Sequence, residues 1–189
     1  MGLHMTQKER YIIRNEIENT IKEENIDRSK FHEVSKFFYE NILRKFYYTF
    51  FEYDKNIRYS EPKKIDLSYA WLHFRKNLNH SETIRLHYDD TDMDSIKSLI
   101  PYYSDDKKCF FIVADGWVYE GEISEILTAF SEIYFVTDFY ILSKKFDWVV
   151  VNCEDGECIW RVSSEKHYSN SAIDKARKII VESIFCCYD

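Results

Sequence analysis

The chemically most active side chains of the sequence gather between residues 87 and 94. His87 is followed by Asp89 and Asp90, and a histidine close to a carboxylate is the arrangement that a general base requires. The catalytic candidates of the sequence are therefore His87, Asp89 and Asp90. The alternative interpretation is a surface histidine beside an acidic turn, which is the more common arrangement in proteins.

The same acidic run has the spacing of a calcium-binding loop only in part. If Asp90, Asp92 and Asp94 take loop positions 1, 3 and 5, position 6 is Ser95 and position 12 is Pro101. The EF-hand loop requires glycine at the first of these and glutamate at the second. The sequence therefore predicts no metal site, and the aspartates are better interpreted as the start of a helix, where the helix dipole favours acidic side chains.

The five cysteines do not form a disulfide framework or a metal-binding pattern. Asp155-Gly156 predicts a two-residue hairpin turn, which would place Cys153 directly opposite Cys158 on an apolar face. A disulfide is geometrically possible there, but buried packing as reduced thiols is the preferred interpretation. Cys109 lies inside an apolar run, so we expect an inert thiol.

Composition and absent motifs exclude several functional classes. Four glycines and two prolines leave little material for glycine-rich phosphate loops, and no Walker, Rossmann, nucleophile-elbow or zincin motif is present. The net charge of −7 argues against nucleic-acid binding. The sequence thus predicts no cofactor, no nucleic-acid partner and no membrane partner, and it leaves the oligomeric state open. No signal peptide is apparent, so we expect a cytoplasmic protein, with residues 1–5 as an expression scar.

The periodicity of apolar residues predicts an α+β fold with a mainly antiparallel sheet that ends in a three-stranded meander. Helices would pack against the sheet, and the chain would begin with an antiparallel helical pair. We expect one domain over 6–189, with the helical pair in 6–53 and the sheet-containing body in 65–189. The expected helices are 7–24, 30–52, a short helix from Asp66 or Ser68, 92–102, 121–130 and 171–186. The expected strands are 83–88, 109–114, 138–143, 148–154 and 157–163.

The second predicted helix carries an unusual number of aromatic residues between Phe31 and Tyr53. A helix of this composition has to be covered on more than one side. The apolar spacing predicts that the two N-terminal helices bury these residues: Ile13, Ile17, Ile21, Phe38, Ile42 and Phe46. If several aromatic residues are exposed instead, an oligomer through that face becomes the preferred interpretation.

Residues 138–150, read as DFYILSKKFDWVV, contain a strand of the form D-[FY]-Y-I-x-S, a short turn, and then [FY]-x-W with a further apolar strand. This pattern resembles that of small uncharacterised bacterial cytoplasmic proteins. Over residues 120–163 the chain is also loosely similar to SUKH-type immunity proteins, which protect bacteria against toxins. The resemblance implies an α+β binding protein without catalytic residues.

Three hypotheses for the function remain open at this point. The preferred one is a non-catalytic protein-binding module, of an immunity or antitoxin type, that binds a basic protein through an acidic surface. The residues expected to face that partner are Asp89, Asp90, Asp92, Asp94, Glu154, Asp155 and Glu157. The second is an enzyme or ligand-binding protein with a pocket of dispersed residues, namely His87, Asp89, Asp90, Tyr140 and Arg161. The third is a structural, oligomer-forming protein that uses the aromatic N-terminal helices.

Overall fold

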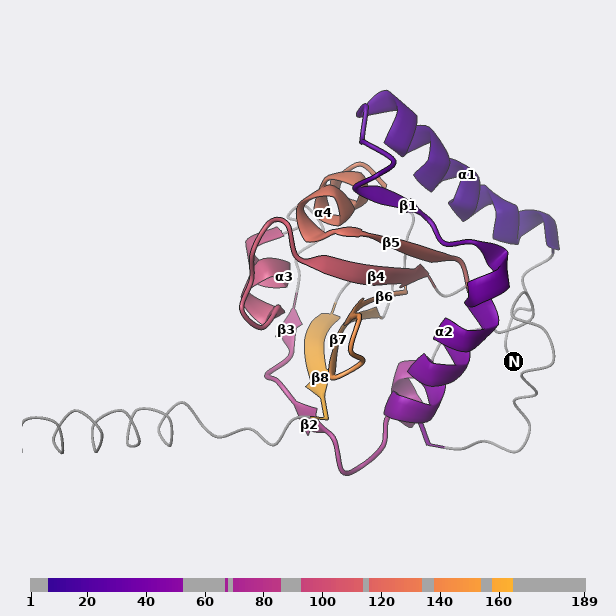
Figure 1. Cartoon of the computed structure of the whole chain (residues 1–189). Helices are drawn as coiled ribbons and strands as arrows, with labels where there is room; N and C mark the ends of the chain where they lie inside the picture. The colour runs from indigo at the N-terminus through magenta and orange to yellow at the C-terminus, as the bar shows by residue number, and fades with distance from the viewer. Residues whose placement is uncertain are drawn as a thin grey trace, which may run out of the picture.

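The computed structural model describes residues 7–52, 67, 70–85, 93–113, 116–133, 138–153 and 158–164. One sheet with the strand order β1-β5-β4-β6-β7-β8-β2 forms its centre, and β3 pairs with β8 beside β2. All of the described strand pairings are antiparallel, and they run through these strands: β1 (Phe31–Glu33), β2 (Asn79–His80), β3 (Ile84–Arg85), β4 (Lys108–Val113), β5 (Val118–Glu122), β6 (Phe139–Ser143), β7 (Trp148–Cys153) and β8 (Cys158–Ser163). The predicted α+β class is confirmed (Figure 1).

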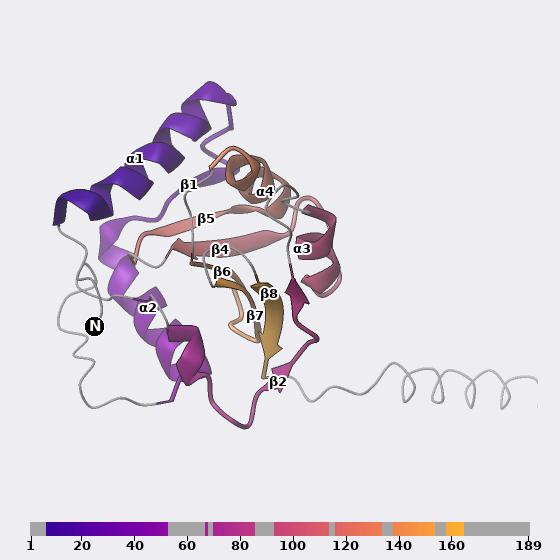
Figure 2. The same ribbon diagram turned by 180° about the vertical axis from the view of Figure 1, so that it is seen from behind.

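Helices cover both faces of this sheet. The described helices are α1 (Gln7–Glu23), α2 (Lys36–Phe50), the 3-10 helix η2 (Ala70–His73), α3 (Met93–Leu99) and α4 (Ile123–Ser131). In both views α1 and α4 lie above β5 and α2 lies below it (Figures 1 and 2). Phe130 of α4 contacts Phe139 on one face of β6, and Phe46 of α2 contacts Tyr140 on the other. The arrangement is therefore three layers, with the sheet between two layers of helices.

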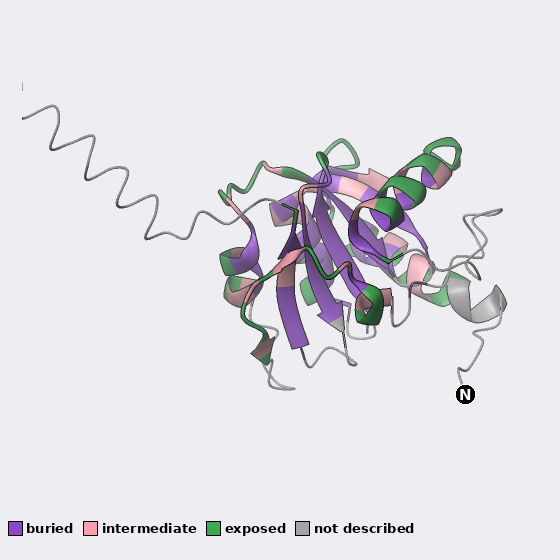
Figure 3. Ribbon diagram, turned by 90° about the horizontal axis from the view of Figure 1, so that it is seen from below, coloured by how far each residue is buried: buried purple, intermediate pink, exposed green. Residues whose placement is uncertain are grey.

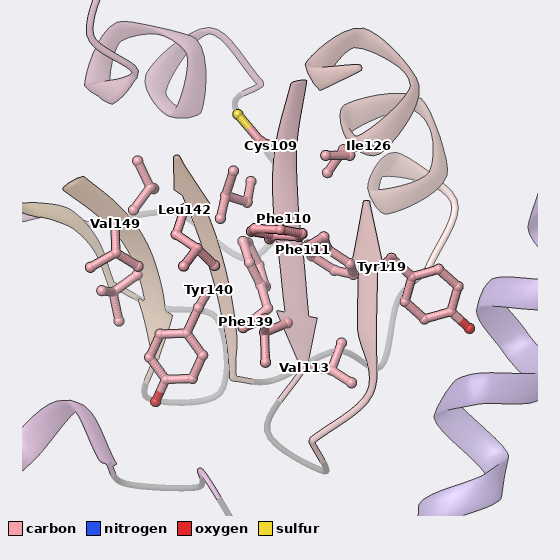
Figure 4. Close-up of a cluster of buried hydrophobic side chains, with 14 of the residues drawn as sticks. Cys109, Phe110, Phe111, Val113, Tyr119, Ile126, Phe139, Tyr140, Leu142 and Val149 are labelled. Carbon is pink, nitrogen blue, oxygen red and sulfur yellow. The ribbon is translucent and has the colours of Figure 1, made fainter. Parts of the chain in front are cut away.

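The predicted central strand and the predicted meander are both confirmed. Every residue of β4 from Cys109 to Val113 is buried, as a continuously apolar strand covered on both faces requires. The strands β6, β7 and β8 follow one another along the chain and pair with antiparallel register. Cys153 pairs with Cys158, as the hairpin turn predicts. The purple strands at the centre of Figure 3 and the aromatic side chains of Figure 4 show how this sheet forms the core.

The second N-terminal helix is shorter than predicted. Residues 31–33 form β1, which pairs with β5, and α2 begins only at Lys36. Asp27 accepts a hydrogen bond from the Ser29 backbone N–H at 2.8 Å in a turn that leads into β1. The two predicted helices are present, but this edge strand separates them, so a continuous helix over 30–52 is wrong.

The buried side of α2 also differs from the predicted one. Its buried residues are Tyr39, Leu43, Phe46, Tyr47 and Phe50. Of the predicted set, Ile17, Ile21 and Phe46 are buried, Ile13 and Ile42 are half-buried, and Phe38 is exposed. The cause is a small difference in the orientation of the helix: it faces the sheet with Tyr39 and Leu43, which each follow by one position the predicted Phe38 and Ile42.

The end of β5 differs from the prediction, because residues 121 and 122 were expected to begin the helix 121–130. The structure places Gly121 in the strand between Phe31 of β1 and Cys109 of β4, and α4 begins at Ile123. Predicted α3 and α4 are confirmed in type, as Pro101 follows α3 and the apolar residues of α4 are buried. The predicted helix 171–186 lies outside the described residues. No helix among the described residues combines the length and the apolar character needed to cross a bilayer.

Candidate functional site

Most of the site residues predicted from the sequence lie outside the described residues. This applies to His87, Asp89, Asp90 and Asp92, and equally to Glu154, Asp155 and Glu157. Asp94 is described: it lies in the first turn of α3, is exposed, and pairs with Lys97 at 3.4 Å. Both the catalytic and the partner-facing role of these residues therefore stay predictions. In the described part of the chain, no three His, Cys, Asp or Glu residues gather in a way that could hold a metal ion.

Two other residues of the dispersed-pocket hypothesis are described, and the structure does not bring them together. Tyr140 pairs with Val151, and Val151 pairs with Trp160, so Tyr140 and Trp160 share one face of the sheet. Arg161 follows Trp160 and lies on the opposite face. Each side chain also has its own backbone partner: the Tyr140 hydroxyl donates to the Leu67 carbonyl at 2.9 Å, and Arg161 donates to the Leu99 carbonyl at 3.3 Å. Tyr140 and Arg161 therefore cannot line one pocket.

A polar network of described residues lies where α1 crosses the β1 edge of the sheet. Glu33 of β1 is its centre. Its carboxylate accepts a hydrogen bond from Arg14 Nε at 2.9 Å and another from the Tyr39 hydroxyl at 2.7 Å. The three residues come from α1, β1 and α2, so this one carboxylate joins all three elements. None of the three was singled out from the sequence.

A second carboxylate, Glu18 of α1, continues this network. It accepts hydrogen bonds from Arg28 at 2.9 Å and from the Tyr119 hydroxyl of β5 at 3.2 Å. Trp117 lies beside Arg14, whose guanidinium is 5.3 Å from its ring centroid, and beside the Tyr11 ring at 5.4 Å. We call the set Arg14, Glu18, Arg28, Glu33, Tyr39 and Tyr119 the α1 network.

The electrostatics of the α1 network suit a structural role rather than proton transfer. Burial, together with the neighbouring carboxylate Glu33, raises the pKa of Tyr39 far above its usual value. Burial raises the pKa of Tyr119 as well, and Glu18 and Glu33 add to this effect. Both hydroxyls therefore stay protonated as hydrogen-bond donors. The hydrogen bond with Glu33 raises the pKa of Arg14, so its guanidinium stays positively charged. The network holds α1 on the sheet and offers no group poised to react at neutral pH.

The network makes the stability of the protein depend on pH. Burial on its own would raise the pKa of Glu18, but the hydrogen bonds and charge of Arg28 and the hydroxyl of Tyr119 outweigh it and lower the pKa below its ordinary 4.5. A carboxylate whose folded pKa is lowered stabilises the fold above its unfolded pKa and loses this contribution as the pH falls through the folded pKa. We expect Glu18→Gln to be less stable than wild type at pH 6, with the difference shrinking towards pH 3. Urea unfolding across this range measures it, and Glu24→Gln, at an exposed position, is the control; a difference that does not change with pH would contradict the prediction.

Cys109 of β4 is the described thiol that sequence reasoning assessed for reactivity. It is fully buried, and burial raises its pKa to about 12. The thiolate is the reactive form of cysteine, so this group is inert at neutral pH. The structure thus agrees with the predicted inert thiol. Cys158 is also buried, as the predicted apolar face requires.

A different surface, the solvent-facing side of α2, is the candidate binding site. Phe37 is 80% exposed and Phe38 is 52% exposed, and their rings meet edge to face at 5.2 Å. Tyr48, 44% exposed, lies on the same side of the helix. At about 100° per residue, positions 37, 41, 44 and 48 fall within roughly 60° of one another. We call this surface, formed by Phe37, Phe38, Asn41, Arg44 and Tyr48, the α2 outer face.

The cations of α2 are already engaged with their own chain. Arg44 pairs with Glu40 one turn earlier in the helix. The Lys45 ammonium lies 4.4 Å from the ring centroid of Phe146, and the Lys36 ammonium lies 6.0 Å from that of Trp117. The outer face therefore presents aromatic rings between polar groups whose charges are largely compensated.

Comparison with known proteins provides a family but no function. No curated protein and no solved structure matches the chain. One family model matches residues 9–172, which include every described strand and almost all of the first helix. The chain therefore belongs to the family described as "Family of unknown function (DUF6756)".

Proposed function

We propose that this protein is a non-catalytic protein-binding module and that the α2 outer face is its binding surface. The observation that carries the proposal is the exposure of Phe37 and Phe38, two large aromatic side chains in mutual contact on the outside of a well-packed helix. Exposed aromatic groups of this kind are enriched at the energetic centres of protein interfaces. Core packing does not explain these two, because the inward-facing aromatic residues of α2 are Tyr39, Phe46, Tyr47 and Phe50.

An inhibitory form of this binding, as in immunity proteins, is supported by the sequence resemblance of residues 120–163 alone. In that case a basic toxin would be a suitable partner, since the chain carries a net charge of −7. The acidic residues 89–94 and 154–157 are then a second proposed surface. The experiment below distinguishes the two surfaces.

The test is differential capture with four forms of the purified chain as bait in an extract of the source cells. We expect wild type to retain a protein that the double variant Phe37→Ser, Phe38→Ser loses. The variant Asp89→Asn, Asp90→Asn, Asp94→Asn tests the acidic surface and spares Asp92, which the sequence predicts as a helix cap. Tyr102→Ser is the matched control, because Tyr102 is 90% exposed but lies outside α2.

Hydrogen exchange on the captured complex then locates the contact. Protection of the α2 amides in the complex supports the α2 outer face as the binding surface. If all four baits retain the same proteins, or if only the triple Asp variant loses one, the α2 outer face is not the binding surface.

A further inference from the structure

We infer that the partner of the α2 outer face is a second copy of this chain, bound through an antiparallel contact between two α2 helices. This inference rests on the proposed function and gives that binding surface an occupant. It begins from the spacing of the exposed residues. Phe37, Asn41, Arg44 and Tyr48 follow one another at intervals of four, three and four, which is the spacing of a helix–helix seam.

The order of residues along this seam is self-complementary. A two-fold axis that passes between Ile42 and Leu43 relates position 37 to position 48 and position 41 to position 44. Each Phe37 then meets Tyr48 of the second copy, and each Asn41 meets Arg44 of the second copy. Aromatic rings thus face aromatic rings at both ends. At the centre, an amide oxygen accepts a hydrogen bond from a guanidinium. Two-fold contacts of this isologous kind are the most common in oligomers.

The charges of α2 permit two copies to approach. Arg44, Lys45 and Lys36 would repel their counterparts if they were uncompensated. Arg44 is neutralised by Glu40 of its own chain, and the Lys45 and Lys36 ammonium groups lie over the Phe146 and Trp117 rings, which attract these cations without neutralising them. The remaining obstacle is the net charge of −7 on each copy, which salt screens. Addition of salt should therefore strengthen the dimer rather than weaken it.

The size of the face sets the expected affinity. The seam from residue 37 to residue 48 is about 16 Å long at 1.5 Å per residue. Two such faces form an interface that is small among specific protein–protein interfaces. We therefore expect a reversible dimer with a Kd of roughly 10–100 μM. Phe37 would be a main contributor to the contact, because it is the most exposed residue of the seam.

The test is sedimentation equilibrium of the purified full chain between about 1 μM and 1 mM. We expect a monomer–dimer equilibrium. Phe37→Ser and Tyr48→Ser should each raise the Kd of the dimer about tenfold or more, since Phe37 of one copy contacts Tyr48 of the other. Tyr102→Ser should leave the equilibrium unchanged. Far-UV circular dichroism of each variant checks that the fold is retained, as expected for changes at exposed positions.

Asn41 reports the orientation of the two helices. In the antiparallel contact it faces Arg44 of the second copy, so Asn41→Glu should tighten the dimer about fivefold and Asn41→Lys should weaken it by a similar factor. In a parallel contact position 41 would face itself, and both changes would weaken the dimer. Weakening by Asn41→Glu therefore overturns the antiparallel arrangement.

A chain that stays monomeric up to 1 mM overturns the inference altogether, and so does a dimer that is insensitive to Phe37→Ser. Neither result decides the proposed function, which depends on differential capture from the extract. If capture depends on Phe37 and Phe38 while the purified chain stays monomeric, the binding surface is correct and its occupant is a different protein.

Discussion

Replacing Gly121 with alanine should lower the free energy of unfolding by about 2 kcal/mol. Gly121 lies in β5 between Phe31 on one side and Cys109 on the other. A Cβ atom built at this position would lie 2.4 Å from the Lys30 carbonyl oxygen and 2.9 Å from the Phe31 Cα atom. Both of these are backbone atoms, so rotation of a side chain cannot relieve the clash, and overpacking of this kind typically costs 1–3 kcal/mol.

Urea unfolding measures this loss, and hydrogen exchange locates it. The hydrogen bonds at risk flank Gly121 on the β1 side: the Glu122 N–H donates to the Lys30 carbonyl at 2.7 Å, and the Val34 N–H donates to the Val118 carbonyl at 2.9 Å. We expect these two amides to exchange faster in the variant, while β7 amides keep their protection relative to global unfolding. Glu120→Ala is the control in the same strand, because it removes a lysine pair at the surface and should cost less than 1 kcal/mol. A loss below 0.5 kcal/mol for Gly121→Ala would show that β1 can move away without cost.

Gly121 also shows which parts of the fold could be predicted from the sequence. The strands β4, β6, β7 and β8 were predictable because their signals are local: continuous apolar runs and short turns. Strand β1 was not, since three residues inside an amphipathic stretch give no periodicity of their own. This strand forms because Gly121, 90 residues later in the sequence, leaves room for the β1 backbone, and no local pattern contains that information.

The candidate sites likewise divide into those with a local sequence signal and those that depend on tertiary packing. The inert Cys109 and the Cys153–Cys158 pairing were predictable from one strand and one hairpin. The α1 network was not, because Arg14, Glu33 and Tyr119 converge only when β1 pairs with β5. The α2 outer face was anticipated only as a condition, namely that exposed aromatic residues would favour an oligomer. Which aromatic residues are exposed depends on the side of α2 that faces the sheet, and this is a property of tertiary packing.

The α1 network predicts a loss of similar or larger size for Glu33→Ala, about 2–3 kcal/mol in the free energy of unfolding. The substitution removes the acceptor of the Tyr39 hydroxyl and the counter-charge of Arg14 together. Tyr39 is buried and Arg14 only partly exposed, so water cannot fully replace the carboxylate. Leaving a buried donor without its acceptor costs about 1–3 kcal/mol, and loss of one partner of a partly buried ion pair adds to it.

Two companion variants separate this effect from a general loss of surface charge. Glu40→Gln removes an exposed pair with Arg44 within α2 and should change stability by less than 0.5 kcal/mol. Tyr39→Phe removes only the hydroxyl and should cost about 1 kcal/mol. In the double variant the two losses should not add. Once Glu33 is absent, the Tyr39 hydroxyl is a buried donor without an acceptor, and Tyr39→Phe removes this unpaired hydroxyl. Additive losses would mean that Glu33 and Tyr39 act independently, and α1 would then be held on the sheet by Ile17 and Ile21 rather than by the shared carboxylate.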